Sequence, residues 1–267
     1  KNNVFANIGY FERAPFSDAV FINNTNITNE NAENQKIFSA ELGYGFRSDK
    51  FRADLNVYRT KWMDRTYTIS RTADNIQYTA NILGVDALHQ GIELELSYRP
   101  IETLTLTGMA SLGDWQWDND VKNVQVFDDQ QNAIGDPIDI FIDGVKVGNS
   151  AQTTFAIGAD YEVLETTTLR ASFNYAADYF ADYNPTGRTT PNLPQTWEMP
   201  DYGLLDLGLT HRFNFGGFNA QINANVFNVL DTEYISDAQD GSGSVASTAL
   251  VYFGAGRTYT VGAKINF

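Results

Sequence analysis

Residues 36–47 read KIFSAELGYGFR, in which apolar and polar side chains alternate from one position to the next. Successive side chains of an extended strand point to opposite faces, so this alternation predicts a strand with one apolar and one polar face. After the turn at Ser48–Lys50, the alternation resumes in FRADLNVY, residues 51–58, and the two stretches together predict an antiparallel hairpin. The apolar face of the first strand carries Phe38, Ala40, Leu42, Tyr44 and Phe46.

The same alternation recurs along the whole chain and predicts about ten strands, most of them about ten to thirteen residues long. Strands of soluble sandwiches usually have about 5–6 residues, whereas a tilted strand that spans a membrane needs about 9–11. The strand length therefore favours a transmembrane β-barrel. The alternating residues that mark these strands lie near residues 4–10, 36–47, 51–58, 92–99, 104–112, 155–161, 169–175, 205–209, 218–226 and 257–267, and the strands extend beyond most of these ranges.

The connections between these strands alternate between short and long. Short turns are expected near residues 48–50, 100–102, 164–166 and 214–217. The long segments are residues 14–35, 64–88, 118–150, 180–201 and 230–255. Outer-membrane barrels have short periplasmic turns and long extracellular loops. We therefore expect an all-β, antiparallel transmembrane β-barrel with this arrangement of turns and loops.

The composition fits a barrel wall and argues against several other classes of protein. The chain has 267 residues and a net charge of −15, from 18 Lys and Arg against 33 Asp and Glu, which argues against nucleic-acid binding. It has no Cys, so disulfides and thiolate metal sites are excluded. No run of about 18 apolar residues predicts a transmembrane helix. The polar face mixes charges of both signs, as a water-filled lumen allows; it carries Glu41, Arg52, Asp54, Glu93, Glu95, Asp160 and Arg170.

Several segments carry a family resemblance. The last strand, RTYTVGAKINF at residues 257–267, ends on an aromatic residue and resembles the carboxy-terminal signal strand of outer-membrane proteins. Residues 225–234, NVFNVLDTEY, resemble the motif before the final loop of TonB-dependent receptors. Residues 9–16, GYFERAPF, and residues 91–95, GIELE, resemble further segments of that family. The resemblance extends over essentially the whole chain.

This resemblance implies a fold and a function. TonB-dependent receptors have a barrel of about 22 strands filled by an amino-terminal plug. Residues 1–267 are therefore expected to be the carboxy-terminal part of such a barrel. The plug domain, the short TonB-contacting box and the signal peptide find no match here, so they are either upstream of Lys1 in a longer protein, which we favour, or missing. The implied function is ligand capture at the outer membrane of a Gram-negative bacterium, followed by import into the periplasm with TonB-derived energy.

The implied partners follow from that role. The TonB complex would act through the upstream plug, and the barrel assembly machinery would insert the chain among outer-membrane lipid and lipopolysaccharide. The ligand would be a small molecule, such as a siderophore, vitamin B12 or an oligosaccharide. A surface lipoprotein is a further candidate partner. We expect no enzymatic activity, no cofactor and no nucleic-acid partner.

Candidate site residues come from the loops and the last strand. Aromatic loop residues can stack on a flat ligand or form a membrane-interface girdle, and both interpretations stay open for Trp115, Trp117 and Trp197. With Tyr183, these three are the candidate ligand contacts. Acidic loop clusters, such as Asp128 with Asp129, are interpreted first as solvated loop surface, because none has the spacing of a twelve-residue calcium loop; Ca²⁺ binding by these oxygen-rich loops is the alternative. The expected barrel-insertion signal consists of Tyr259, Val261, Ala263, Ile265 and Phe267.

Three other functions stay open from the sequence. A passive porin shares the alternation, the turns and the terminal aromatic residue. A small outer-membrane barrel enzyme would need an acid, a base or a nucleophile at the loop end. Only His89 is positioned there as a base, because His211 lies beside a short turn. A soluble β-sandwich or lectin module is disfavoured by the strand length.

Overall fold

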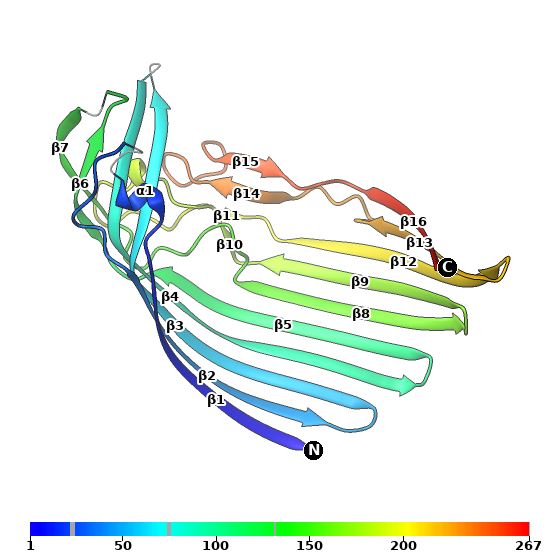
Figure 1. Ribbon diagram of the computed structural model, residues 1–267. Helices are drawn as coiled ribbons and strands as arrows, with labels where there is room; N and C mark the ends of the chain where they lie inside the picture. Colours follow the sequence, from blue (N-terminus) through cyan, green and yellow to red (C-terminus); the bar gives the residue numbers. More distant parts are fainter. Residues whose placement is uncertain (22–24, 74–75, 131, 267) are drawn as a thin grey trace.

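The computed structural model describes residues 1–21, 25–73, 76–130 and 132–266. Ten antiparallel strands lie in one row across a curved sheet, with β1 at one edge and β16 at the other (Figure 1), and two further strands join the sheet beside this row. This arrangement confirms the predicted all-β fold. Within the described residues these two edges do not pair, so the sheet is open. In order across the sheet, the strands are β1 (Asn2–Arg13), β2 (Gln35–Arg47), β3 (Phe51–Ala73), β4 (Ile76–Ile101), β5 (Leu104–Trp117), β8 (Thr153–Leu164), β9 (Thr167–Ala177), β12 (Tyr202–Phe215), β13 (Phe218–Phe227) and β16 (Thr258–Asn266).

The short turns lie at one end of the sheet and the longer connections at the other (Figure 1). We call the latter the loop layer; it comprises residues 14–34, 63–87, 118–152, 178–201 and 228–257 as far as they are described. Within the described residues, no helix is long and apolar enough to cross a membrane. The remaining elements are α1 (Ser17–Val20), β6 (Val121–Phe127), β7 (Ala133–Ile140), β10 (Tyr179–Phe180), η2 (Pro185–Gly187), β11 (Glu198–Met199), β14 (Ile235–Gln239) and β15 (Leu250–Phe253).

The register sorts the side chains of the sheet onto two faces. Leu42 lies opposite Val57, and Ile92 lies between Val57 and Leu112, so four neighbouring strands form one apolar row. These four side chains are between 45% and 58% exposed. Burial of apolar surface is worth about 25 cal/mol per Å², so this row is unfavourable in water and favourable in an apolar medium. We call this side of the sheet the outer face.

The opposite side, the inner face, carries the polar residues that the alternation predicts. Asp160 lies opposite Arg170, and Arg170 Nε lies 2.7 Å from Asp160 Oδ1. Arg52 forms an ion pair with Asp54 on the same face. Exposed ion pairs of this kind contribute only about 0–1 kcal/mol each. Backbone hydrogen bonds between the strands therefore stabilise this part of the sheet. The charged side chains make its inner face polar.

Residues 64–88 are mostly strand, so the expectation of a long loop there is wrong. β3 and β4 continue as paired strands above Arg65, which lies opposite Val85. A bulge separates this part from the sheet below: Asp64 has a φ of +56°, and the register shifts after Trp62. Such a bulge changes which side chains face inward. The alternation of apolar and polar residues breaks at this bulge. Residues 64–88 therefore lack the sequence pattern that predicts a strand.

The loop layer contains apolar cores of its own. The larger core covers the upper parts of β3, β4 and β5, and Tyr183 packs into it from residues 178–201. A smaller core gathers Tyr179, Ala181, Met199 and Ala238. The long connections therefore pack against one another. The buried residues of the larger core are Ala80, Ile82, Val85, Ala87, Trp117, Val121, Val124, Ile140, Ile142, Val145 and Tyr183.

Candidate functional site

Aromatic side chains gather on the inner face where the sheet meets the loop layer. Trp115 and Trp117, near the end of β5, lie opposite His89 and Ala87 of β4. The Trp115 side chain is half-buried, and its ring centroid lies 5.6 Å from that of His89. Because residues two apart on a strand share a face, both tryptophans belong to the same face.

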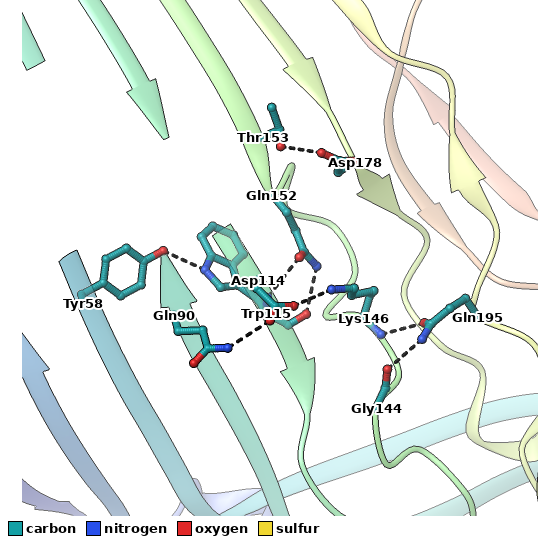
Figure 2. Close-up of polar contacts among 10 residues, drawn as sticks. All are labelled: Tyr58, Gln90, Asp114, Trp115, Gly144, Lys146, Gln152, Thr153, Asp178 and Gln195. Carbon is teal, nitrogen blue, oxygen red and sulfur yellow. Dashed lines mark hydrogen bonds and ion pairs between the residues drawn. The ribbon is translucent and has the colours of Figure 1, made fainter. Parts of the chain in front are cut away.

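Two glycines leave room for aromatic rings to lie along the inner face of the sheet. A Cβ at Gly113 would come within 2.8 Å of the Trp115 ring, and a Cβ at Gly91 within 2.7 Å of the Tyr58 hydroxyl. A larger residue at either position would therefore displace the neighbouring ring. Trp115 Nε1 donates a hydrogen bond to the Tyr58 hydroxyl at 2.8 Å (Figure 2). We call Tyr58, His89 and Trp115 the inner-wall platform.

Polar contacts fix the backbone that carries the platform (Figure 2). The buried Gln152 side chain accepts from Trp115 N at 3.0 Å and donates to Trp115 O at 2.9 Å, as a neighbouring strand would. Asp114 accepts from Gln90 Nε2 at 3.0 Å and from Lys146 Nζ at 2.5 Å. These contacts hold the end of β5, where its regular pairing with β8 has already ended.

A second aromatic cluster lies in the larger core of the loop layer. Trp117 packs edge-on against Tyr183 with ring centroids 5.3 Å apart, and Tyr183 stacks on Tyr67 at 6.1 Å. The Tyr67 hydroxyl donates to Asp182 Oδ2 at 2.9 Å, although the two residues are 115 positions apart. Burial raises the pKa of the Tyr183 phenol and of the Asp182 carboxyl, because their charged forms lose hydration.

Arg65 reaches this cluster from β3, above the bulge. Its Cζ lies 5.2 Å from the ring centroid of Trp117 and 5.7 Å from that of Trp62. Within the described residues, no carboxylate lies within 4.0 Å of its guanidinium group. Burial lowers the pKa of Arg65, again because the charged form loses hydration. Cation–π contacts with the two rings offset part of that loss.

A buried ion pair joins three segments of the loop layer. Arg188 Nη2 lies 3.7 Å from Asp240 Oδ2, and the two side chains are only 3% and 4% exposed. Asp240 Oδ1 also accepts from Trp197 N at 3.2 Å, and Phe141 N donates to Arg188 O at 2.8 Å. Burial lowers the pKa of Arg188, and the charge of Asp240 opposes that shift. The connections before β8, before β12 and before β16 therefore meet at one point.

The four predicted ligand contacts do not form one cluster. Trp117 and Tyr183 pack together, Trp115 lies lower on the same face, and Trp197 packs against the smaller core. Trp117 is 4% exposed and Tyr183 is 1% exposed, so both rings stabilise the loop layer in this arrangement. Trp115 and Trp197 are half-buried. Ligand contact by any of the four stays a prediction.

Sequence reasoning missed several residues of β3 that join the aromatic clusters. Tyr58 is expected only as a residue of the polar face, and Trp62 and Arg65 lie in or beside the expected loop. Their signal was the interleaving of aromatic and basic residues in RTKWMDRTYT, residues 59–68. The bulge within this stretch shifts the phase of the alternation.

The last strand has the two-faced character expected of an insertion signal. Its outer-face residues pair with outer-face residues of β13, which continues the apolar face to the edge of the sheet. Recognition by the assembly machinery stays a prediction. Phe267 lies outside the described residues, and the other four residues, Tyr259, Val261, Ala263 and Ile265, lie opposite Val226, Ala224, Ile222 and Ala220.

Some of the loop acids are engaged in other contacts. In the described part of the chain, no group of three or more His, Asp or Glu residues is arranged to hold a metal ion. Asp118 Oδ2 lies 2.8 Å from Lys61 Nζ, and Asp128 Oδ1 accepts backbone hydrogen bonds from Gln130 and Asn132. Calcium binding by the loops stays a prediction.

Comparisons with known proteins agree with this architecture. No curated protein matches the chain by sequence. Among solved structures, the ferric-catecholate import receptor Fiu from E. coli K12 in its closed form has a TM-score of 0.64 at 16% identity, over 98% of this chain and 32% of that one. The siderophore receptor PiuA from Acinetobacter baumannii has a TM-score of 0.64 at 15% identity, over 100% and 34%. The copper transporter OprC has a TM-score of 0.64 at 15% identity, over 99% and 37%.

This chain thus spans about a third of the length of these structures. At such low identity the likeness shows a shared fold. The family model described as "TonB dependent receptor-like, beta-barrel" matches residues 2–229, which is most of the chain. The chain belongs to the TonB-dependent receptor family, and its sheet is part of that family's β-barrel.

Proposed function

We propose that this chain is the carboxy-terminal part of an outer-membrane receptor that binds a ligand at the cell surface and imports it with TonB-derived energy. Membership of the family supports this role. One observation carries the proposal: the sheet has an exposed apolar outer face, while its polar inner face bears the inner-wall platform beneath the loop layer. Such a wall suits lipid on one side and a bound solute on the other.

The two free edges of the sheet fit a larger barrel. β1 and β16 each present an unpaired edge, and exposed edges invite further pairing. Upstream strands of the same protein would pair with both edges and close a barrel of about 22 strands. The loop layer would then lie outside the cell, and the short turns would lie in the periplasm.

The inner face also fits an upstream plug. Glu41, Glu93 and Glu95 lie on this face, and none of the ion pairs among the described residues involves them. Their carboxylates would face the space that a plug fills. A plug with basic residues on the matching surface would neutralise them, and it would give the TonB complex a part to pull.

The inner-wall platform is the proposed ligand contact within this chain. Aromatic rings stack on flat or ring-shaped ligands, and Trp115 is accessible enough to do so. The structural neighbours include receptors named for ferric-catecholate and siderophore uptake and a transporter named for copper. A metal chelate is therefore the first ligand class to test, followed by oligosaccharides. The packed loop layer favours a gated receptor over an open passive channel.

The test uses the whole protein that carries this chain, in its native outer membrane. Three strains are compared: wild type, a strain lacking this protein, and a strain lacking TonB. Each receives ⁵⁵Fe-loaded catecholate and hydroxamate siderophores, ⁶⁴Cu²⁺ and a labelled oligosaccharide. We expect uptake of one probe class to require both the protein and TonB. Uptake that requires the protein but not TonB would contradict the proposal and support a passive porin.

A paired substitution tests the platform in the same assay. Trp115→Ala removes the platform ring, and we expect uptake of the accepted probe to fall. The control is Tyr98→Ala, which removes an exposed outer-face ring near the short turns. Equal uptake by the two variants, at equal amounts of protein in the outer membrane, would contradict ligand contact at Trp115.

A further inference from the structure

The hairpin of β14 and β15 has one covered edge and one free edge. Along β14, Asp182 N donates to Ala238 O at 2.8 Å, so the connection before β12 covers that edge. Among the described residues β15 pairs with β14 alone, and its other edge is unpaired. β15 leads through residues 254–257 into β16, which is itself an edge strand (Figure 1). The two strands therefore present one free edge along residues 250–266.

The β15 part of this edge carries exposed apolar side chains. Leu250, Tyr252 and Phe253 are 55%, 57% and 70% exposed, whereas Val251 packs against the smaller core. Proteins usually protect an edge strand with charged residues, proline, a bulge or a covering segment. The four residues of β15 include no charged residue and no proline. An edge of this kind is suited to pairing with a further strand.

A notch lies where the free edge passes from β15 to β16. It is lined by residues 231–234, which follow β13, and by Phe253, Gly254 and Gly256, which precede β16. We call it the edge notch; its volume is about 470 Å³. A Cβ at Gly254 would overlap the Tyr234 ring, so glycine at this position lets the ring approach the backbone of the edge. Pockets of about 300–1,000 Å³ hold whole small molecules, so the notch has room for a long side chain.

The edge notch is acidic and has no counter-ion. Asp231 and Glu233 line it, and none of the ion pairs among the described residues involves either of them. Asp231 Oδ1 accepts from Arg257 N at 2.8 Å, which fixes this carboxylate beside the start of β16. The rings of Tyr234 and Phe253 line the same space. Carboxylates beside aromatic rings favour a cationic side chain, because both attract positive charge.

We propose that the upstream strand that pairs with β16 continues past residues 254–257, pairs with β15 and places a Lys or Arg side chain in the edge notch. The inference rests on the proposed function, because it names the partner of one free edge of that barrel. Strands of the required length occur in this protein, since β3 has 23 residues and β4 has 26. The cation would approach Asp231 and Glu233, and its methylene groups would pack on the two rings.

The edge and its charge favour a strand of the same protein over lipid or a foreign chain. Another strand offers β15 backbone hydrogen bonds, which lipid tails lack. The carboxylates of the edge notch repel the phosphate groups of lipopolysaccharide. The free edge of β15 is continuous with that of β16, so the strand that pairs with β16 already runs alongside residues 254–257.

The test is photo-cross-linking in the whole protein, in its native outer membrane. The photoreactive residue p-benzoylphenylalanine replaces Phe253 in one variant and Val261, which is 80% exposed on β16, in a second. A third variant carries it at Asp129, which is exposed in the turn between β6 and β7. Mass spectrometry identifies the linked peptides at equal amounts of protein in the outer membrane. Tyr252 replaces Phe253 as the labelled position if that variant does not reach the membrane.

We expect the probes at Phe253 and Val261 to link to one strand upstream of Lys1. The two linked sites should lie about eight residues apart, because paired strands advance in step. The site linked from Phe253 should be the more carboxy-terminal one, since the strand is antiparallel to β16, and a Lys or Arg should lie beside it. The probe at Asp129 should not link to this strand.

A charge reversal tests the edge notch itself. Glu233→Lys should lower the cross-linking yield from Phe253 about threefold, because it repels the proposed basic side chain. The yield from Val261 should stay unchanged, since β16 lies beyond the notch. The control is Glu198→Lys, which makes the same charge change at an exposed position of β11 outside the notch. This control should leave both yields unchanged.

The outcomes separate this inference from the proposed function. Linkage of Val261 but not of Phe253 to the upstream strand would overturn the inference and leave the larger barrel standing. Linkage of Phe253 to lipid, to lipopolysaccharide or to another protein would also overturn it, as would equal yields from Phe253 with and without Glu233→Lys. If neither position links to upstream sequence, closure of the barrel at β16 is wrong, and the proposed function loses its larger barrel together with this inference.

Discussion

The ten-strand sheet and the loop layer sort their side chains in different ways. In the sheet, Leu42 and Val57 share a face because side chains alternate along each strand and the register aligns them. In the loop layer, contacts join distant segments, as the Tyr67–Asp182 hydrogen bond does across 115 positions. The outer face of the sheet exposes its large apolar side chains, whereas the loop layer buries many of its own in two cores and exposes others, such as Phe253. The sheet therefore depends on the medium around it, and the loop layer depends on its internal contacts.

This difference determines where each region is most sensitive to substitution. A charge is most harmful at the exposed outer-face positions of the sheet, which would face lipid. In the loop layer the buried positions are the sensitive ones, because no surrounding medium replaces a lost contact. We expect the inner face of the sheet to tolerate polar changes, because its ion pairs are largely exposed.

Loss of the buried Asp240 carboxylate should have the largest effect. Asp240→Ala leaves Arg188 buried without its partner, which costs about 3–5 kcal/mol. We expect the loop layer to open, so that proteases cleave residues 178–201 or 228–257 at least about 100-fold faster in the whole protein. Limited proteolysis of intact cells measures this rate.

The control for that prediction is Asp139→Ala. Asp139 lies 3.4 Å from Lys122, and both side chains are more than 40% exposed. Cleavage should then proceed at the wild-type rate. Equal rates for Asp139→Ala and Asp240→Ala would contradict a special role of the buried pair. Replacing both partners in Arg188→Met/Asp240→Leu should restore part of the resistance, because no buried charge then lacks a partner.

A charge on the outer face tests the dependence of the sheet on lipid. Val57→Arg places a cation in the exposed apolar row and should cost about 2–4 kcal/mol in a membrane barrel. Asn56→Arg puts the same residue one position earlier, on the inner face, and should cost much less. Urea unfolding of the whole protein in lipid vesicles compares the two. If both variants unfold at the same urea concentration, the assignment of the faces is wrong.

A substitution at Gly113 tests the packing where the ten-strand sheet meets the loop layer. A Cβ at this position would lie 2.8 Å from the Trp115 ring, so Gly113→Ala should displace the ring and break its hydrogen bond to Tyr58. Overpacking of this kind costs about 1–3 kcal/mol. Tryptophan fluorescence and its quenching by iodide report the displacement. Gly262→Ala is the control, because a Cβ there meets no atom within 4 Å; matching spectra for the two variants would refute the prediction.

The smallest effect is expected for an ion pair on the inner face. Arg170→Gln removes the contact with Asp160, which lies at 2.7 Å between side chains that are 62% and 46% exposed. Water and salt screen such a pair, so the free energy of unfolding should change by about 0–1 kcal/mol. The same urea assay applies. A loss above about 2 kcal/mol would mean that the inner face is dry and packed.

Much of the sheet was predictable because alternation of apolar and polar residues within a strand depends only on neighbouring positions. Alternation in residues 36–47 and 51–58 needs only the geometry of an extended chain, and both stretches are strands in the expected register. The upper parts of β3 and β4 were missed because the bulge near Asp64 breaks that local signal. In the candidate site, Trp115 and Trp117 were identified by residue type, while their different burial depends on segments far along the chain.

The sequence alone determined the two faces of the sheet, the ten-strand order of hairpins and the family resemblance, since each depends on neighbouring residues. Only the tertiary structure decided which loop residues meet. Tyr67 and Asp182 come from a strand and a loop connection 115 positions apart, and Arg188 and Asp240 come from different connections. No period in the sequence encodes such contacts, because they form when distant segments bury apolar surface together and bring their charges with them.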